Sequence, residues 1–323
     1  MNGYVGIDVS KERLDVLLLH EANRVGQHFT NTATGFDKLD GWLKRRFKPD
    51  QVHICLEATG PYGEAVADYL FAQGYTVSVV NPARIKGYAE SQMQRNKTDK
   101  LDAALIADFC RTQHPAAWTP APPQIRQLQQ LVRHLDDLTQ MRQQAKNRLG
   151  LPGQRQPVTD HLRAQITFLD QQIRETKQAI TDLLNHYPDL KRQKDLLLSI
   201  PGLGELTIGK LIAECRDLRA FRDVRQLVAF AGLNPRQHVS GSSIHWKPSI
   251  SRTGSASLRA ALYMPALTAM RFNPVLRAFA DRLRARGVTG KALVVAVMRK
   301  LLHLVFGVLK SGQPFDPNWA TAS

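Results

Sequence analysis

The sequence predicts a mixed α/β sheet domain, followed by an antiparallel pair of helices and a mostly helical C-terminal domain. Three observations predict this order. β-branched apolar runs alternate with helical spacing as far as a cluster of prolines near residue 118. A heptad pattern follows, and the chain beyond it is helical and strongly basic. We therefore expect three domains, at residues 1–118, 119–190 and 191–323.

The first domain begins with three expected strands. Apolar runs at 4–10 and 14–19, separated by a short polar segment, predict a β-hairpin, and a third strand is expected near 27–31. Helices and strands then alternate: helix 35–47, strand 52–57, helix 62–73, strand 76–80 and a helix from 82. This order predicts a mixed sheet covered by helices.

Four carboxylates stand where such a sheet would collect them. Asp8 and Glu57 each end an apolar run, and Asp99 and Asp102 open a predicted helix. We expect Asp8 to project from the centre of the first strand and Glu57 from the fourth, and residues three apart on a helix share a face. Four oxygen donors at one sheet edge can hold Mg²⁺ against a phosphodiester. Element order and acid placement together are those of an RNase H-like (RuvC-like) fold.

Charge is distributed unevenly along the chain. The 323 residues carry 44 Lys and Arg against 28 Asp and Glu, a net charge of +16. Residues 191–323 hold 21 of the basic and 7 of the acidic residues, a balance of +14, so the rest of the chain carries only +2. This asymmetry indicates catalysis in the front part and polyanion binding in the back part.

Cysteine usage and hydropathy indicate a protein of a reducing cytoplasm. Cys55, Cys110 and Cys215 are isolated, without the spacing of a zinc site or a disulfide framework. No signal peptide is visible at the start. The most apolar stretch, 292–309, contains Arg299, Lys300 and His303, so we expect a buried amphipathic helix and no membrane partner.

The middle of the chain has helical periodicity on both sides of a Pro/Gly break at 150–153. In the second segment the apolar seam steps by four and three, with one polar member: Leu162, Ile166, Leu169, Ile173, Thr176, Ile180 and Leu183. Two such helices predict an antiparallel coiled-coil hairpin. The hairpin could be a spacer between domains or a contact between protomers.

Two motifs of the basic part carry possible DNA chemistry. Pro201-Gly202-Leu203-Gly204 between apolar helices is typical of a helix-hairpin-helix, whose glycines and helix amides approach a phosphate; a plain interhelical turn is the alternative. The loop at 234–243 contains Ser240, Ser242 and Ser243, with Arg236, Lys247 and Arg252 nearby as candidate phosphate contacts. A serine among cations can act as a nucleophile, although serine-rich loops are common.

These motifs together resemble the DEDD transposases of bacterial insertion sequences, the relatives of the Piv invertase and bridge-RNA-guided recombinases. The resemblance rests on Gly-Ile-Asp-Val-Ser-Lys-Glu, Glu-Ala-Thr-Gly, Asn-Lys-Thr-Asp with Asp102, Ile-Pro-Gly-Leu-Gly, and Ala-Gly-Leu-Asn-Pro-Arg with Ser-Gly-Ser-Ser. It covers essentially the whole chain, in the family's order.

The resemblance implies a function more specific than the residues alone indicate. It implies that Asp8, Glu57, Asp99 and Asp102 bind Mg²⁺, and that Ser240 attacks a DNA phosphate to form a covalent phosphoserine intermediate. It further implies a structured bridge RNA that pairs with donor and target DNA, and a dimer of dimers whose protomers share each site. The chain would then be the DNA transposase or recombinase of an insertion sequence.

Two other classes of function remain open from the sequence. One is a RuvC-like, structure-selective DNA endonuclease that uses metal-activated water, in which Ser240 would be structural. The other is a non-catalytic DNA-organising protein, which would have no need of four converging acids. Actin-like sugar kinases share an early Gly-Ile-Asp strand, but no second Gly-rich phosphate loop is found.

Overall fold

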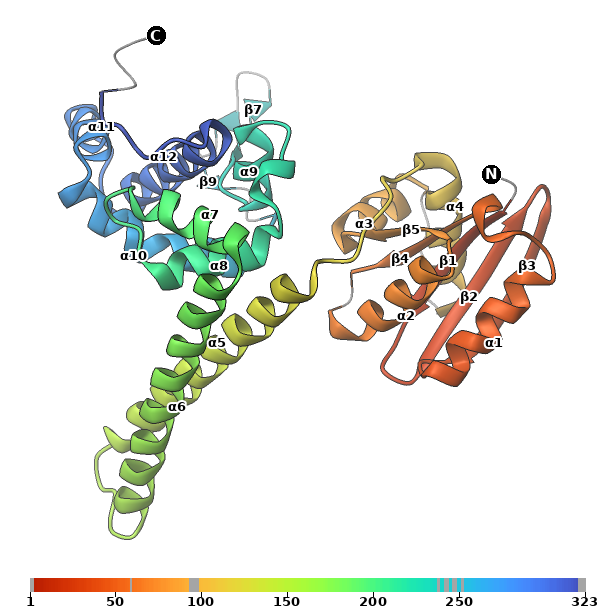
Figure 1. Ribbon diagram of the computed structural model, residues 1–323, viewed down its shortest axis with the longest axis horizontal. Helices are drawn as coiled ribbons and strands as arrows, with labels where there is room; N and C mark the ends of the chain where they lie inside the picture. Colours follow the sequence, from red (N-terminus) through yellow and green to blue (C-terminus); the bar gives the residue numbers. More distant parts are fainter. Residues whose placement is uncertain are drawn as a thin grey trace. The chain divides into compact units, whose positions relative to one another are not determined.

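A computed structural model describes residues 3–58, 60–92, 99–236, 239–240, 244–245, 249–250 and 253–318. The chain divides into two compact units, residues 1–120 and 121–323. Each unit is described by itself, with the element labels of Figure 1.

Unit 1 is built on a five-stranded mixed sheet. Its strands are β1 (Gly3–Val9), β2 (Arg13–His20), β3 (Asn23–Thr30), β4 (Val52–Glu57) and β5 (Thr76–Val80). They lie in the order β3-β2-β1-β4-β5; β1, β2 and β3 pair antiparallel, and β1, β4 and β5 pair parallel. This is the order of the RNase H-like fold.

Helices cover both faces of the sheet, and side chains alternate between these faces along each strand. One face packs Val5, Ile7 and Ile54 against α1 (Ala33–Lys44) and α2 (Pro61–Ala72) in one apolar core. The other face carries Cys55 and Val80, which pack with α3 (Pro82–Ser91) and α4 (Asp99–Gln113). Both faces are therefore buried over the central strands, whereas the edge strand β3 is largely exposed.

Because Gly6 has no side chain, α4 can lie directly on β1. A Cβ added at Gly6 would stand 2.2 Å from the carbonyl oxygen of Ala103 and 2.3 Å from the amide nitrogen of Ala107. Ala103 and Ala107 are one helical turn apart, and both are buried. Glycine on the strand and alanines on the helix thus permit a backbone-to-backbone approach that larger residues would prevent.

Unit 2 begins with a long helical hairpin, α5 (Pro123–Leu149) and α6 (Val158–His186), which Figure 1 shows projecting from the remaining helices of the unit. The predicted seam of α6 is buried at every position except Ile166, which is half-buried. Its polar member, Thr176, donates from Oγ1 to the carbonyl oxygen of Gln172 at 2.7 Å, so burial leaves no unpaired hydroxyl.

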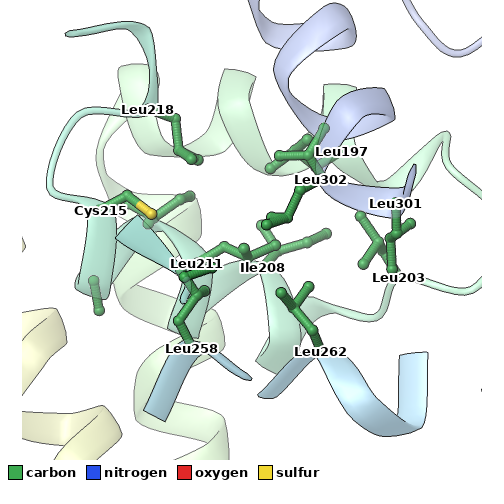
Figure 2. Packing of buried hydrophobic residues seen from close by; sticks show 14 of the residues in the cluster. Leu197, Leu203, Ile208, Leu211, Cys215, Leu218, Leu258, Leu262, Leu301 and Leu302 are labelled. Carbon is green, nitrogen blue, oxygen red and sulfur yellow. The ribbon is translucent and has the colours of Figure 1, made fainter. Parts of the chain in front are cut away.

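The remaining helices of unit 2 pack around one core. They are α7 (Pro188–Leu198), α8 (Glu205–Cys215), α9 (Val224–Phe230), α10 (Ala256–Phe272), α11 (Pro274–Ala285) and α12 (Gly290–Ser311). Figure 2 shows side chains of α7, α8, α10 and α12 meeting in it, among them Leu197, Ile208, Leu262 and Leu301. The hairpin contributes Leu128 and Ile180 to the same core. The hairpin and the C-terminal helices therefore share one core within the second compact unit.

The apolar stretch near the C-terminus forms the core helix α12. By length and composition, among the described residues, this helix could cross a membrane, with a mean hydropathy of 2.0. Half of that window is buried inside the unit, where Val297, Leu301, Leu302 and Val305 have no exposed surface. A core helix of this kind is weak support for a membrane span.

The structure corrects three details of the sequence analysis. The third strand starts at Asn23, four residues earlier than expected, because Glu21 turns the chain with a φ of 53°. Asp8 is the penultimate residue of β1, near its end rather than at its centre. The C-terminal helices begin at Pro188 rather than Lys191, because proline suits the first turn of a helix.

Candidate functional site

Asp8 and Glu57 lie side by side at the carboxyl ends of two parallel strands. The register pairs Gly6 with Cys55 and Ile7 with Leu56, so the next step brings Asp8 beside Glu57. Neighbouring strands are about 4.8 Å apart, which brings the two carboxylates within reach of one cation. Both residues are partly buried.

Both carboxylates are on the face covered by α4. Gly6 is on that face because α4 lies against it, and Cys55 is there because its thiol contacts Cys110 of α4. The hydrogen bond between the thiols of Cys55 and Cys110, together with burial, raises the pKa of the Cys110 thiol. Asp8 and Glu57 are each two residues further along their strands, so alternation gives them the same orientation.

Measured along β1, the first turn of α4 lies at the same level as these carboxylates. The helix runs antiparallel to β1, since Ala103 lies over Gly6 whereas the His114 ring lies beside Tyr4. Asp99 precedes Ala103 by four residues, or about 6 Å along the helix. Asp8 follows Gly6 by two residues, or about 7 Å along the strand. The helix therefore starts level with Asp8.

Asp102 is half-buried in this first turn, next to Ala103. Side chains on a helix lean toward its N-terminus, which for Asp102 is the direction of the carboxylate edge. Asp99 begins the helix, but its side chain lies outside the described part of the structure. Among the described side chains, no three His, Cys, Asp or Glu are grouped closely enough to hold a metal ion. Asp8, Glu57 and Asp102, whose side chains are all described, therefore do not form such a group by themselves.

Sequence reasoning missed an ion pair next to this edge, in which only the aspartate is buried. Asp15 of β2 is directly opposite Asp8 in the antiparallel register and is 8% exposed. Arg13 donates from Nε to Oδ2 of Asp15 at 2.8 Å, and its Nη2 contacts Oδ1. The signal in the sequence was an aspartate inside the apolar run Leu14-Asp15-Val16.

Ser240 lies in a β-hairpin of unit 2, between α9 and α10. The outer ladder pairs β6 (Pro235–Arg236) with β9 (Ser249–Ile250), and the inner ladder pairs β7 (Val239–Ser240) with β8 (Ile244–His245). Ser240 is opposite Ile244, so it is the last paired residue before the tip. Its side chain and that of Arg236 lie outside the described part, as do Ser242, Ser243, Lys247 and Arg252 entirely.

The base of this hairpin is fixed to the helices. Gly254 has a φ of 144°, and a Cβ there would stand 2.4 Å from the carbonyl oxygen of Phe230. Ser255 donates from its amide to the same carbonyl at 2.8 Å and from Oγ to Oε2 of Glu214 at 2.7 Å. Glycine is thus required at 254 to bring the strand back against α9.

A groove of about 630 Å³ opens between the hairpin base and α12. Its floor is apolar, with Leu233, Ile250 and Val295, and Lys291, Arg299 and Lys300 supply three positive charges. His303 also lines it; burial, with the charges of Lys300 and Arg299, lowers the pKa of this histidine. The groove can therefore attract a polyanion next to the Ser240 hairpin.

The turn between α7 and α8 assigns different roles to its two glycines. Gly202 has a φ of 108°, and a Cβ there would stand 2.7 Å from the Cβ of Ala269 on α10, so internal packing requires glycine. Gly204 is the N-cap of α8, and a Cβ there would meet nothing within 4 Å. Glu205 in the first helical turn is engaged with Thr181 and with Lys194. Only Gly204 has open space for a ligand to approach.

The structure thus brings Asp8, Glu57 and the start of α4 to one edge of the sheet in unit 1. Ser240 belongs to unit 2, together with Gly202, Gly204 and the groove on α12. The candidate acidic residues and the candidate nucleophile are carried by separate compact units.

Comparison with known proteins relates the chain to transposases and to a gene-inverting protein. A family model of the IS110 DEDD type, described as Transposase, matches residues 5–150, and one described as Transposase IS116/IS110/IS902 family matches residues 194–281. The chain is 33% identical over 315 residues to the pilin gene-inverting protein of Moraxella bovis, covering 97% of both chains. It is 24% identical over 240 residues to the transposase for insertion sequence element IS1111A of Coxiella burnetii, covering 65% of this chain and 63% of that one.

Proposed function

This chain belongs to the IS110 family of DEDD transposases, and we propose that it cleaves and exchanges DNA strands at a divalent-metal site. Asp8, Glu57, Asp99 and Asp102 would hold the metal, and Ser240 would be the nucleophile. The observation that carries the proposal is the adjacency of Asp8 and Glu57 on one face, level with the first turn of α4.

The donor set fits Mg²⁺. Carboxylate oxygens are hard ligands, which Mg²⁺ prefers, and the four proposed donors are all carboxylates. When bound, the ion would stabilise negative charge on the attacking and leaving oxygens of a phosphodiester. Without a cation, the carboxylates of Asp8 and Glu57 would repel each other across the strand pair. A bound cation would relieve this repulsion, which favours binding of a metal ion.

Ser240 would supply covalent chemistry. Its hydroxyl oxygen forms a bond to the phosphorus of one DNA strand, and its proton goes to a base or to water. The bond from phosphorus to a deoxyribose oxygen breaks, and that oxygen leaves with a proton. A hydroxyl from the exchanged strand then attacks the phosphoserine and restores Ser240. One phosphodiester replaces another, so strand exchange needs no external energy source.

The surroundings of the hairpin support DNA binding by unit 2. The groove with Lys291, Arg299 and Lys300 lies at the base of the Ser240 hairpin. The open N-terminus of α8 at Gly204 is a second candidate contact for a phosphate, as in a helix-hairpin-helix. We also propose contacts from Arg236, Lys247 and Arg252. Such contacts neutralise phosphates without reading sequence, so binding should weaken as salt rises.

Sequence selection would come from a structured bridge RNA that pairs with donor and target DNA, as family membership suggests. We further propose a dimer of dimers in which α5 and α6 form a coiled-coil contact between protomers. Four large apolar side chains of the hairpin support this, because they are exposed by half or more: Met141, Leu151, Val158 and Phe168.

A covalent adduct tests the proposal. Purified protein with its co-purifying RNA is incubated with Mg²⁺ and labelled DNA carrying the sequences that flank its gene, then run on a denaturing protein gel. We expect labelled DNA on the wild-type protein and on the control Asp50→Asn, whose aspartate is exposed and remote from the site. Ser240→Ala and Asp8→Asn should give no adduct, whereas Ser242→Ala and Ser243→Ala should retain it. Cleaved DNA without any adduct would indicate hydrolysis by metal-activated water instead.

A further inference from the structure

We propose that Arg13 binds the phosphodiester on which the acid site acts, and that Asp15 is the positioning residue that holds it there. The inference rests on the proposed function, since it adds a substrate contact to the site of Asp8, Glu57, Asp99 and Asp102. It concerns a side chain at the sheet edge to which no role has been assigned above.

The sheet register brings Asp15 into the same row as the acid site. Asp8 pairs with Asp15, and Asp15 pairs with His28 of β3. Residues directly opposite in an antiparallel pair have the same orientation, with Cβ atoms about 5 Å apart. Glu57, Asp8, Asp15 and His28 therefore form one row across four strands, on the face covered by α4.

Asp15 is a carboxylate committed to Arg13 rather than to a metal. Its side chain is 11% exposed, and each of its two oxygens contacts the guanidinium, one of them at 2.8 Å. A buried carboxylate directly opposite Asp8 would add repulsion to an already negative edge unless it were paired. The bidentate contact removes that repulsion and fixes the plane of the guanidinium.

The backbone of Arg13 is fixed as firmly as its side chain. The Ser10 amide and hydroxyl both donate to the Arg13 carbonyl oxygen at 2.9 Å, and the Arg13 amide donates to Ser10 Oγ at 3.1 Å. Asn31 donates from Nδ2 to the Ser10 carbonyl oxygen at 2.9 Å. The turn that follows Asp8 is thereby tied to the start of β2, so Arg13 stays at the edge where Asp8 lies.

Arg13 is fixed at both ends, yet 47% of its side chain is exposed. It lines a hollow of about 840 Å³ along β3 and α1, whose other cations are Lys38 and Arg45. A second hollow of about 370 Å³ is lined by Asp15, His28 and Ala103. The larger hollow lies against α1, which covers the opposite face of the sheet, whereas the smaller one lies on the α4 face beside Asp15. A preorganised and half-exposed guanidinium next to the proposed metal site suits a phosphate, which matches its planar donors. The exchanged DNA strand would then pass over the start of β2.

The test compares variants of Arg13 with a variant of a matched ion pair in the last turn of α4, at the end of the helix away from the acid site. There Arg111 donates from Nη2 to Oδ1 of Asp108 at 2.6 Å, and its side chain is 51% exposed. Wild type, Arg13→Gln, Arg13→Lys, Asp15→Asn, Arg111→Gln and Asp8→Asn are purified with their RNA. For each we measure the rate of adduct formation at saturating labelled DNA, the Kd for that DNA, the half-saturating Mg²⁺ concentration and the melting temperature.

We expect Arg13→Gln to slow adduct formation on the order of 100-fold, the effect of removing one preorganised donor. Its Kd and its half-saturating Mg²⁺ concentration should stay within about threefold of wild type, because the loss occurs where charge develops. Asp15→Asn should lose about 10-fold, as for a residue that orients another. Arg13→Lys should retain more activity than Arg13→Gln. In a further variant, Arg13→Ala, added methylguanidinium should partly restore the rate, which a purely structural role would not allow. Arg111→Gln should react as wild type.

The proposal is overturned if Arg13→Gln reacts at the wild-type rate while Asp8→Asn is inactive. It is also overturned if Arg13→Gln loses its RNA, or loses activity only in step with a fall in melting temperature. An active Asp8→Asn would instead refute the proposed function, and the inference with it.

Discussion

Replacing Gly6 by alanine tests how the fold brings the acid site together. The new Cβ would stand 2.2 Å from the carbonyl oxygen of Ala103, 2.3 Å from the amide nitrogen of Ala107 and 2.9 Å from its Cα. All three atoms belong to the α4 backbone, so no side-chain rotation can relieve the contact. Ordinary contact would return only if α4 moved away from β1 by about 1 Å.

That displacement has two measurable consequences. Overpacking of this kind costs about 1–3 kcal/mol of folding free energy. The first turn of α4 would also move away from Asp8 and Glu57, and misplacement of reacting groups by about 1 Å can cost about 100-fold in rate. We therefore expect Gly6→Ala to lose far more activity than its loss of stability explains.

Hydrogen exchange of peptides from β1 and α4, with the adduct assay on the same preparation, measures both effects. Gly26→Ala is the matched control on the same sheet, because a Cβ there would have its nearest neighbours at 3.8 Å. That variant should exchange and react as wild type. A Gly6→Ala protein with native exchange in α4 and the wild-type adduct rate would refute this explanation of the site.

Three further predictions concern stability. Gly202→Ala should destabilise unit 2 by about 1–3 kcal/mol in urea denaturation, because its Cβ would stand 2.7 Å from that of Ala269. The control Gly204→Ala should cost less than about 1 kcal/mol. Equal losses of stability in the two variants would contradict the packing role of Gly202. Asn273→Ala should cost about 1–3 kcal/mol, because this fully buried side chain accepts from the amides of Val275 and Leu276; Thr289→Ala, at an N-cap without a side-chain bond, is the control. Burial, and to a smaller extent the charge of His114, lowers the pKa of His53 from its ordinary value of 6.5. As the pH falls, His53 is therefore protonated in the unfolded state before it is protonated in the folded state. Unit 1 should therefore lose stability as the pH falls from about 6.5 toward 5, with a shallower dependence in His53→Gln; an unchanged slope in urea titrations of that variant would contradict the assignment.

Local patterns predicted the sheet of unit 1 well. Strand positions followed from alternation, and four of the five expected strands match the observed ones within about a residue. The third strand was the exception, because Asn23–Thr30 is exposed at six consecutive positions and only Phe29 is buried. An edge strand without an apolar rhythm gives sequence analysis little signal.

The adjacency of the acids followed from element order, but the means of achieving it did not. Asp8 and Glu57 were expected at one edge because each of them ends an apolar run with the pattern of a strand. The dependence on Gly6, Ala103 and Ala107 arises from a contact between residues about 100 positions apart, which no local pattern encodes. The same holds for the register that brings Asp15 opposite Asp8. The hairpin seam was predicted from spacing, whereas its shared core with the C-terminal helices depends on tertiary packing.

The central claim is that Asp8, Glu57, Asp99 and Asp102 form one metal site, and it can be mapped without reference to activity. Fe²⁺ replaces Mg²⁺ in the RNA-bound protein, and peroxide with ascorbate generates radicals that cut the chain near the bound ion. We predict cuts near residues 8, 57 and 99–102 together, retained in Asp50→Asn and lost in Asp8→Asn. Cuts confined to other segments, or the same pattern in Asp8→Asn, would contradict the claim.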